Sequence, residues 1–470
     1  MLSTIVKRDG RLVPFDEDKI AQAIQKAFTA THQSKGMDVC QMLAREVAAK
    51  ADQTLGSTPS VEQIQDLVES ALIENGYVRT AKAYILYRAE RTRSRDMQTR
   101  LMKIYEDITF SKAADSDLKR ENANINGDSA MGMMLKYGSE GVKQFNDMFV
   151  LKPEHAKAHR EGDIHIHDLD FLTLTTTCCQ IDLLKLFHGG FSTGHGYLRE
   201  PNDISSYAAL ACIAIQSNQN DQHGGQSVPI FDYAMAEGVK KTFRRLYTTN
   251  LAKAVSFTLG IEDYTEVLEE FKLIAGDIAK EYGLYPSLQN NDEYKAKEWE
   301  IASAKYGDEF SHLQDRAEKL AESETDRATY QAMEALIHNL NTMNSRAGAQ
   351  NPFSSINYGT DTSPEGRMVI KNVMLAEEHG LGNGETPIFP IHIFKVKEGV
   401  NYNPGDPNYD LFKLAIRVSA KRMFPNFSFI DAPFNLQYYK PGDYHTEAAY
   451  MGCRTRVIGN IYDPSREIVT

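Results

Sequence analysis

The sequence predicts an α/β protein in two parts, a mostly helical N-terminal domain followed by a larger α/β body. The first observation is that residues 1–95 combine one short hairpin with helices that carry an apolar face. The second is that helical periodicity alternates with short β-rich segments over residues 126–470. The polar stretch at 96–125 separates the two patterns and is predicted to be a linker.

Composition and charge limit the class of protein. The 470 residues are 42% hydrophobic, which is enough for two to three domains with a large core. The net charge of −12 argues against nucleic-acid binding, since such binding needs clustered cations. Neither an apolar run long enough to span a bilayer nor a secretory signal is present, so we expect a cytoplasmic protein without a membrane partner.

Cysteine spacing excludes two common roles. The five cysteines are an odd number and form no CxxC pair, which predicts neither a disulfide framework nor a thiolate zinc site. They stand as separate thiols at Cys40, Cys178, Cys179, Cys212 and Cys453.

The N-terminal domain opens with a predicted hairpin at 6–15, because Asp9-Gly10 is a favoured type I′ turn. Asp16 is expected to cap the helix that follows. The apolar face of this helix consists of Ile20, Ile24, Ala27 and Phe28.

Two further helices complete the predicted N-terminal domain. Ser60 and Gln63 have capping-box spacing, so a helix should begin at Ser60. A third, arginine-rich helix is predicted at 79–95. The apolar face of the second helix consists of Ile64, Leu67, Val68 and Leu72.

The α/β body contains several recognisable elements. The strongly charged segment 290–334 has helical spacing and is interpreted as solvated surface helices. The chain ends after a β-like segment without a convincing terminal element, which is compatible with truncation. The β-rich segments are 164–169, 354–358, 388–394 and 428–430.

Two polar motifs have competing interpretations. His165, His167 and Asp168 have the residue types of a metal site, but no further ligand has suitable spacing nearby, so no metal site is predicted. The segment 222–227 is rich in Gly and Gln, and it either cradles a phosphate or forms an ordinary loop. We interpret it as an active-site loop.

Substrate phosphates have several candidate partners. Ser354 and Ser355 offer hydroxyl and backbone N–H groups, although the start of an ordinary strand explains them nearly as well. Arg346, Arg454 and Arg456 are further candidates among which the sequence does not choose.

The most specific local pattern is Val6-Lys7-Arg8-Asp9-Gly10 followed by Phe15-Asp16-Glu17-Asp18-Lys19-Ile20. Cations beside a Gly turn let charge and backbone N–H groups approach a triphosphate, whereas a solvated basic hairpin is the plain alternative. The pattern resembles the ATP-cone, a regulatory domain of ribonucleotide reductases. The resemblance implies nucleotide contacts at Ile5, Lys7, Arg8, Asp16, Lys19, Val61, Gln65, Tyr87 and Arg91.

An ordered set of motifs carries a second resemblance, from about residue 106 to residue 470. It consists of Glu121-Asn122-Ala123-Asn124 with Met131-Gly132, Gly162-Asp163-Ile164-His165-Ile166-His167-Asp168-Leu169-Asp170, Asn351-Pro352-Phe353-Ser354-Ser355-Ile356-Asn357-Tyr358-Gly359, Thr386-Pro387-Ile388-Phe389-Pro390 and Met451-Gly452-Cys453-Arg454. This set is similar to the class III, oxygen-sensitive ribonucleotide reductases. The resemblance implies a ten-stranded α/β barrel of the glycyl-radical and ribonucleotide reductase type, with a finger loop that delivers a cysteine to the barrel centre.

The resemblance assigns roles to two thiols. Cys453 fits the tip of the finger loop and is expected to carry the thiyl radical that removes the ribose 3′ hydrogen. The second thiol is Cys178 or Cys179, and only one of these neighbours can line the interior of a strand. Spacing to Asp182 in the family favours Cys178, whereas a pair of inert buried thiols is the alternative.

The family also implies cofactors and partners. These are ATP and dATP as allosteric effectors with Mg²⁺, a ribonucleoside triphosphate substrate, formate as reductant, and a radical-SAM activating enzyme. A homodimer or higher oligomer is also implied. The family's C-terminal zinc cluster and glycyl-radical loop are not found in this sequence, so the chain alone is expected to be inactive. A glycyl-radical lyase and a non-catalytic ATP-cone sensor remain as alternatives.

Overall fold

The computed structural model describes residues 2–7, 10–33, 35–111, 126–173, 177–307, 309–346, 348–453 and 455–457. The chain divides into two compact units. One comprises Met1–Ser111 and Tyr137–Asp170, and the other comprises Lys112–Lys136 and Phe171–Thr470. No helix among the described residues has the length and apolar character that a membrane span needs.

The first unit begins with the predicted hairpin. Strands β1 (Thr4–Val6) and β2 (Leu12–Pro14) pair antiparallel, and the Gly10 N–H donates to the Lys7 carbonyl across the turn. Helix α1 (Glu17–Ala30) is capped by Asp16, whose carboxylate accepts the Asp18 N–H at 3.1 Å. The predicted apolar face of α1 is buried, so hairpin, cap and helix face are confirmed.

Helices α2 (Met37–Thr54), α3 (Val61–Glu74) and α4 (Val78–Phe110) complete this helical core. The capping box of α3 is present as predicted. Helix α2 was not predicted from the sequence, and it supplies five buried residues to the core. Helix α4 continues to Phe110 instead of ending near residue 95, because residues 78–110 contain neither Gly nor Pro. The domain limits 1–95, 96–125 and 126–470 therefore stay a prediction.

The segment after α4 holds α6 (Ala130–Phe145), the π-helix η1 (Asn146–Val150), α7 (Pro153–Glu161) and the 3-10 helix η2 (Leu169–Phe171). The strand predicted at 164–169 is wrong. Asp168 has φ of +48°, which an extended strand does not adopt, and η2 begins at the next residue.

A parallel sheet organises the second unit. Its strands are β3 (Thr177–Gln180), β6 (His223–Val228), β7 (Ser354–Tyr358), β8 (Ile391–Val396) and β9 (Asn426–Phe429), in that spatial order. The predictions at 354–358, 388–394 and 428–430 correspond to β7, β8 and β9. The α/β class is confirmed, and within the described residues this sheet has five strands. Closure into a ten-stranded barrel stays a prediction.

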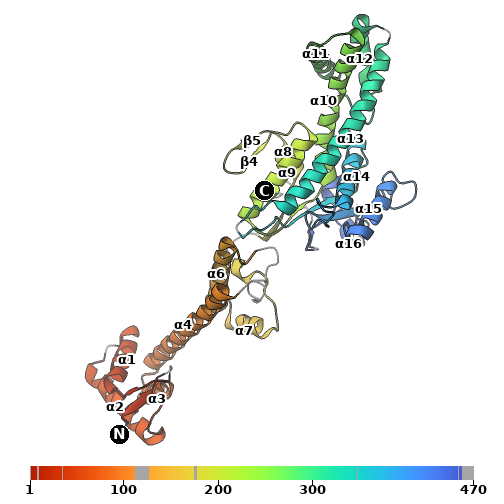
Figure 1. Ribbon diagram of the computed structural model, residues 1–470. Helices are drawn as coiled ribbons and strands as arrows, with labels where there is room; N and C mark the ends of the chain where they lie inside the picture. The colour runs from red at the N-terminus through yellow and green to blue at the C-terminus, as the bar shows by residue number, and fades with distance from the viewer. Residues whose placement is uncertain are drawn as a thin grey trace. The chain divides into compact units, whose positions relative to one another are not determined.

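Helices cover one face of this sheet, as Figure 1 shows for α9, α13 and α14. Alternate strand residues such as Ile356 and Tyr358 pack against these helices, so the residues between them face the opposite side. The covering helices are α9 (Ile204–Asp221), α10 (Phe231–Leu259), α13 (Phe310–Thr342), α14 (Pro364–His379) and α15 (Tyr409–Arg422). The shorter elements are α8 (Leu183–Phe187), β4 (Phe191–Ser192), β5 (Tyr197–Leu198), α16 (Pro433–Leu436), the 3-10 helix η3 (Tyr444–Thr446), β10 (Ala449–Tyr450) and β11 (Arg456–Val457).

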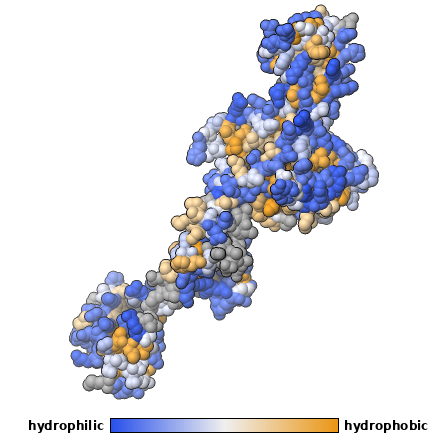
Figure 2. All heavy atoms as spheres, viewed as in Figure 1, coloured by the Kyte–Doolittle hydropathy of each residue, from blue (hydrophilic) through white to orange (hydrophobic). Residues whose placement is uncertain are grey.

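Helices α10 and α13 extend beyond the sheet and form a second core with α11 (Thr265–Tyr282) and α12 (Asp292–Tyr306). Figure 2 shows a mostly hydrophilic outer surface on the visible face of this bundle, in agreement with the charged composition of 290–334. The interpretation of that segment as wholly solvated is nevertheless wrong, because Tyr294, Ala302 and Ala317 are buried. Their small or aromatic side chains recur at helical spacing between the charges.

A buried carboxyl group lies at the centre of this bundle. Glu298 accepts hydrogen bonds from the hydroxyls of Tyr247 (2.7 Å) and Tyr294 (3.2 Å) and from the Gln314 amide (2.8 Å). Burial raises the pKa of Glu298 to about 7, although these three hydrogen bonds oppose the rise.

This raised pKa predicts that the bundle loses stability as the pH increases. Between about pH 4.5 and pH 7 the folded protein holds a proton that the unfolded chain releases. The free energy of unfolding should therefore fall by up to about 1.4 kcal/mol per pH unit across that window. Glu298→Gln should reduce the slope by this amount, as measured by urea unfolding at several pH values, while other buried carboxyl groups such as Asp232 still contribute. Equal slopes in both proteins would contradict the assignment.

Candidate active site

Cys453 lies at the tip of a short hairpin. Strands β10 and β11 pair antiparallel, with Tyr450 opposite Arg456, and the Met451 N–H donates to the Thr455 carbonyl at 3.0 Å. The Cys453 side chain is exposed, and its Sγ lies 3.2 Å from the Thr455 Oγ1. We call residues 449–457 the finger hairpin. The structure thus places Cys453 on the kind of loop that the sequence resemblance implies.

The finger hairpin lies along the sheet face opposite the helices. Asn357 of β7 clamps Tyr450, since its Oδ1 accepts the Tyr450 N–H at 2.8 Å and its Nδ2 donates to the Tyr450 carbonyl at 3.0 Å. The Ser227 hydroxyl of β6 donates to the same carbonyl at 3.0 Å. Further along, the Gly452 N–H donates to the Ser355 Oγ at 3.2 Å. These contacts fix the register of the hairpin on β6 and β7.

Gly452 allows a close approach that a side chain would hinder. A Cβ atom at this position would lie 2.3 Å from Cδ1 of Ile391 on β8. A side chain here would have to displace the end of the Ile391 side chain, so Gly favours the close approach of the hairpin to the sheet.

A buried ion pair holds the base of the finger hairpin. Lys395 of β8 donates to the Glu447 carboxylate at 2.9 Å, and the two side chains are only 1% and 5% exposed. The Thr360 hydroxyl donates to the same carboxylate at 2.8 Å. The finger is thus anchored at its base by a charge pair and along its length by Asn357.

A second carboxylate organises the turn that follows β7. Oδ2 of Asp232, at the start of α10, accepts the backbone N–H groups of Gly359, Thr360 and Asp361 at 2.8–3.1 Å. Burial raises the pKa of Asp232 to about 6, and the Asp361 carboxylate adds to the rise, while Lys395 opposes it. The Asp232 carboxylate therefore fixes the turn that carries Thr360, and the Thr360 hydroxyl donates to Glu447.

The two neighbouring cysteines of β3 have different environments. Cys179 is buried in the core, and Nδ2 of Asn218 on α9 lies 2.8 Å from its sulfur. Burial raises the pKa of the Cys179 thiol to about 11. Ile181 also packs in the core, so the alternation of the strand places Gln180 on the finger side, whereas the left-handed backbone of Cys178 (φ +63°) departs from this alternation. Cys178 is partly exposed, and its sulfur accepts the Gly225 N–H at 3.4 Å.

The segment 222–227, whose composition indicated an active-site loop, is the interior strand β6 from His223 onward. That interpretation is wrong, because pairing with β3 and β7 on both sides compensates the low strand propensity of its glycines.

The side chains predicted to bind phosphate mostly donate hydrogen bonds to main-chain carbonyl groups of the protein. The Ser354 hydroxyl donates to the Pro352 carbonyl, and the Ser355 hydroxyl donates to the Gln226 carbonyl while holding Gly452. Arg346 donates to main-chain carbonyls and Arg456 to the Phe434 carbonyl, while Arg454 lies outside the described residues. Substrate contacts at Ser354 and Ser355 stay a prediction.

The predicted nucleotide contacts of the first unit fall into three groups. The Val6 N–H donates to the Pro59 carbonyl at 2.9 Å, which places the strand with Ile5 and Lys7 beside the start of α3, where Val61 lies. Asp16 and Lys19 form an exposed ion pair at 3.5 Å, and the Arg91 guanidinium lies 5.7 Å from the ring centroid of Tyr87. Gln65 lies one turn beyond Val61 on α3, and Arg8 lies outside the described residues.

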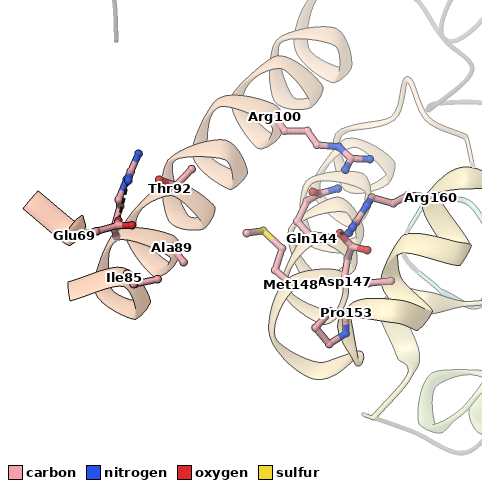
Figure 3. Close-up of a pocket in the computed structure, with 12 residues that line it drawn as sticks. Glu69, Ile85, Ala89, Thr92, Arg100, Gln144, Asp147, Met148, Pro153 and Arg160 are labelled. Atoms are coloured by element: carbon pink, nitrogen blue, oxygen red, sulfur yellow. Dashed lines mark hydrogen bonds and ion pairs between the residues drawn. The ribbon is translucent and has the colours of Figure 1, made fainter. Parts of the chain in front are cut away.

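A cleft of about 870 Å³ lies elsewhere in this unit, between α4 and the η1–α7 segment (Figure 3). It is lined by Arg88, Arg100 and Arg160 among others, but Arg160 pairs with Asp147 at 2.7 Å and Arg88 with acidic residues of α3. None of the predicted nucleotide contacts that the structure describes lines this cleft.

The signals for the anchoring residues were partly visible in the sequence. Asn357 is a polar residue within the predicted strand 354–358, and Lys395 directly follows the predicted strand 388–394. Glu447 carried no sequence signal, because its importance comes from partners that are distant in the chain.

A thiol on a hairpin over a parallel sheet whose first strand carries a second thiol, in a chain that also has a small helical domain, fits the arrangement that the resemblance implies for a ribonucleotide reductase. The chain belongs to the family of anaerobic ribonucleoside-triphosphate reductases, whose model matches residues 121–468. Residues 3–93 match the ATP cone domain.

Named relatives agree with this assignment. The anaerobic ribonucleoside-triphosphate reductases of Salmonella typhimurium and Escherichia coli are each 27% identical to the chain, over 458 and 459 residues. Each alignment covers 97% of this chain and 54% of the relative, so the chain spans about half the length of these proteins. The anaerobic ribonucleotide reductase of Thermotoga maritima, solved with dATP and CTP, has 13% identity and a TM-score of 0.40, covering 73% of this chain and 50% of that one.

Proposed function

We propose that this chain is the catalytic and regulatory part of an enzyme that reduces ribonucleoside triphosphates to deoxyribonucleoside triphosphates without oxygen. The observation that carries the proposal is the finger hairpin, which holds Cys453 against strands β6 and β7 of the sheet whose neighbouring strand β3 carries Cys178. Strands β3 and β7 are separated by β6 alone, so the strand that carries Cys178 lies roughly 10 Å from the strand on which the finger hairpin rests.

In the proposed reaction, a radical on the Cys453 sulfur takes the 3′ hydrogen of the ribose, so that an S–H bond forms as the C–H bond breaks. Cys178 acts from the other side of the sugar and supplies a proton or hydrogen as the 2′-hydroxyl leaves as water. Formate provides the reducing equivalents and becomes carbon dioxide. The net change is one triphosphate and one formic acid to one deoxynucleotide, carbon dioxide and water.

The remaining components follow from the family. A glycyl radical, generated by an activating enzyme that uses S-adenosylmethionine, initiates the radical on Cys453 in the complete gene product, where a structural zinc is also expected. The protein acts in the cytoplasm as a homodimer or higher oligomer. ATP activates it and dATP inhibits it, each with Mg²⁺, through the first unit.

The test is an anaerobic assay of the complete gene product after treatment with the activating enzyme. With formate and each ribonucleoside triphosphate in turn, we expect the matching deoxynucleotide to form, with stimulation by ATP and suppression by dATP. Cleavage of a small organic acid without deoxynucleotide formation would instead identify a lyase. Adenine-nucleotide binding without any turnover would identify a sensor.

Regulation through the first unit is tested with Lys7→Ala/Lys19→Ala. Because α4 runs through residue 95, these substitutions are cleaner than a truncation, which would cut the helix. We expect binding of ATP and dATP, measured by calorimetry on the 470-residue chain, to weaken at least about tenfold. Lys26→Ala, an exposed lysine of α1 outside the predicted contacts, is the matched control. Equal affinities in both variants would exclude this site.

A further inference from the structure

Cys178 has an unusual backbone conformation. Its φ is +63°, a left-handed value that residues with a side chain rarely adopt. The register between β3 and β6 also shifts at this point, since Thr177 pairs with His223 but Cys179 pairs with Gln226. Such a conformation persists only where surrounding contacts impose it, and it concentrates at functional positions.

Gln222 supplies the contact that fixes this conformation. Its side chain is almost fully buried, and its Oε1 accepts the Cys178 N–H at 3.1 Å. Its Nε2 donates to the Gly224 carbonyl at 3.3 Å. Gln222 therefore links the backbone of Cys178 on β3 to the backbone of Gly224 near the start of β6.

Arg346 in turn holds Gln222. One of its terminal nitrogens donates to the carbonyls of Gln219 (3.1 Å) and Gln222 (3.3 Å) at the end of α9, and its Nε donates to the Gln350 amide oxygen at 2.7 Å. A cation at the carbonyl end of a helix is favourably placed. Burial lowers the pKa of Arg346, which shows that the guanidinium is partly removed from water.

The result is a fixed position for one sulfur atom. The left-handed turn at Cys178 brings its Sγ to the Gly225 N–H, at 3.4 Å. We infer that Gln222, held by Arg346, is a positioning residue that keeps the Cys178 sulfur on the Gly225 N–H. This inference deepens the proposed function, because it explains how the second thiol is distinguished from Cys179.

The titration of the Cys178 thiol tests the inference without any turnover. The neighbouring titratable groups are Cys179 on the same strand, His223 on β6 and Arg346 beyond Gln222. Alkylation by iodoacetamide is followed at each cysteine by peptide mass spectrometry over a range of pH, using the 470-residue chain. An N–H donor stabilises the thiolate.

Gln222→Met keeps the side-chain volume but removes the acceptor. We expect the alkylation midpoint of Cys178 to move upward by about one pH unit, while the profile of Cys453 stays unchanged. Arg346→Lys keeps the charge, contacts Cys178 only through Gln222, and should move the same midpoint in the same direction. Asn220→Ala, an exposed neighbour on α9, should move nothing.

An unchanged Cys178 profile in either folded variant overturns the inference. If Gln222→Met fails to fold, Arg346→Lys decides by the same criterion. Failure of the reductase assay with a shifted Cys178 profile would remove the proposed function and leave the positioning role intact.

Discussion

Cys453→Ser in the complete gene product is expected to abolish deoxynucleotide formation while leaving nucleotide affinity unchanged. The serine O–H bond is much stronger than a thiol S–H bond, so a radical cannot be passed to this side chain at a useful rate. The side chain is exposed at the tip of the finger hairpin, and its hydroxyl replacement can still contact Thr455. The substitution therefore changes the chemistry with little effect on the fold.

The adjacent pair on β3 provides a matched control for this experiment. Cys178→Ala should also eliminate product, whereas Cys179→Ala should keep most of the activity and cost about 1 kcal/mol of stability through the lost packing. Product is measured by anaerobic turnover, and stability by urea unfolding. Full activity of Cys453→Ser would refute the radical assignment. Loss of activity in Cys179→Ala with retention in Cys178→Ala would reverse the assignment of the second thiol.

Local signals in the sequence predicted the first unit well. Asp16 and the Ser60–Gln63 box act within four residues of the chain, so their effect does not depend on the tertiary fold. Helix α2 was not predicted because it begins after Gly36, which has no side chain to cap the helix and so gives no sequence signal for a helix start. The full length of α4 was missed because residues 96–125 were interpreted as a polar linker, although Leu101, Ile104 and Ile108 recur at helical spacing within that stretch.

Errors in the body arose where pairing overrides local preference. The glycines of β6 indicate a loop, but the strand is bonded on both sides and therefore forms. Conversely, the alternating segment at 164–169 has strand-like periodicity and still adopts turns, ending in a 3-10 helix. Periodicity records which side chains prefer burial, not whether a partner strand is present.

The candidate site was predictable only in part for the same reason. The motif around Cys453 identified the finger, whereas the clamp between Asn357 and Tyr450 joins residues 93 positions apart. The pair of Lys395 and Glu447 joins residues 52 positions apart. A single sequence contains the residues of such contacts but not their pairing.

Lys395→Met is expected to destabilise the second unit by about 3–5 kcal/mol, because it leaves the buried Glu447 carboxylate without its counter-charge. Urea unfolding of the 470-residue chain measures this loss, and limited proteolysis between residues 440 and 457 reports whether the base of the finger detaches. The control is Lys397→Met, just beyond the end of β8. Lys397 pairs with Asp431 at 3.0 Å, but 39% of the Asp431 side chain is exposed. Loss of that pair should cost no more than about 1 kcal/mol.

The double variant Lys395→Met/Glu447→Gln separates the charge effect from the packing effect. Glutamine keeps an oxygen for the Thr360 hydroxyl and carries no charge. We therefore expect it to recover about 2 kcal/mol of the loss, which is the signature of coupled residues in a double-mutant cycle. If Lys395→Met shifts the unfolding midpoint no more than Lys397→Met does, the ion pair does not hold the finger. Among the described residues its anchoring then rests on Asn357, Ser355 and Ser227.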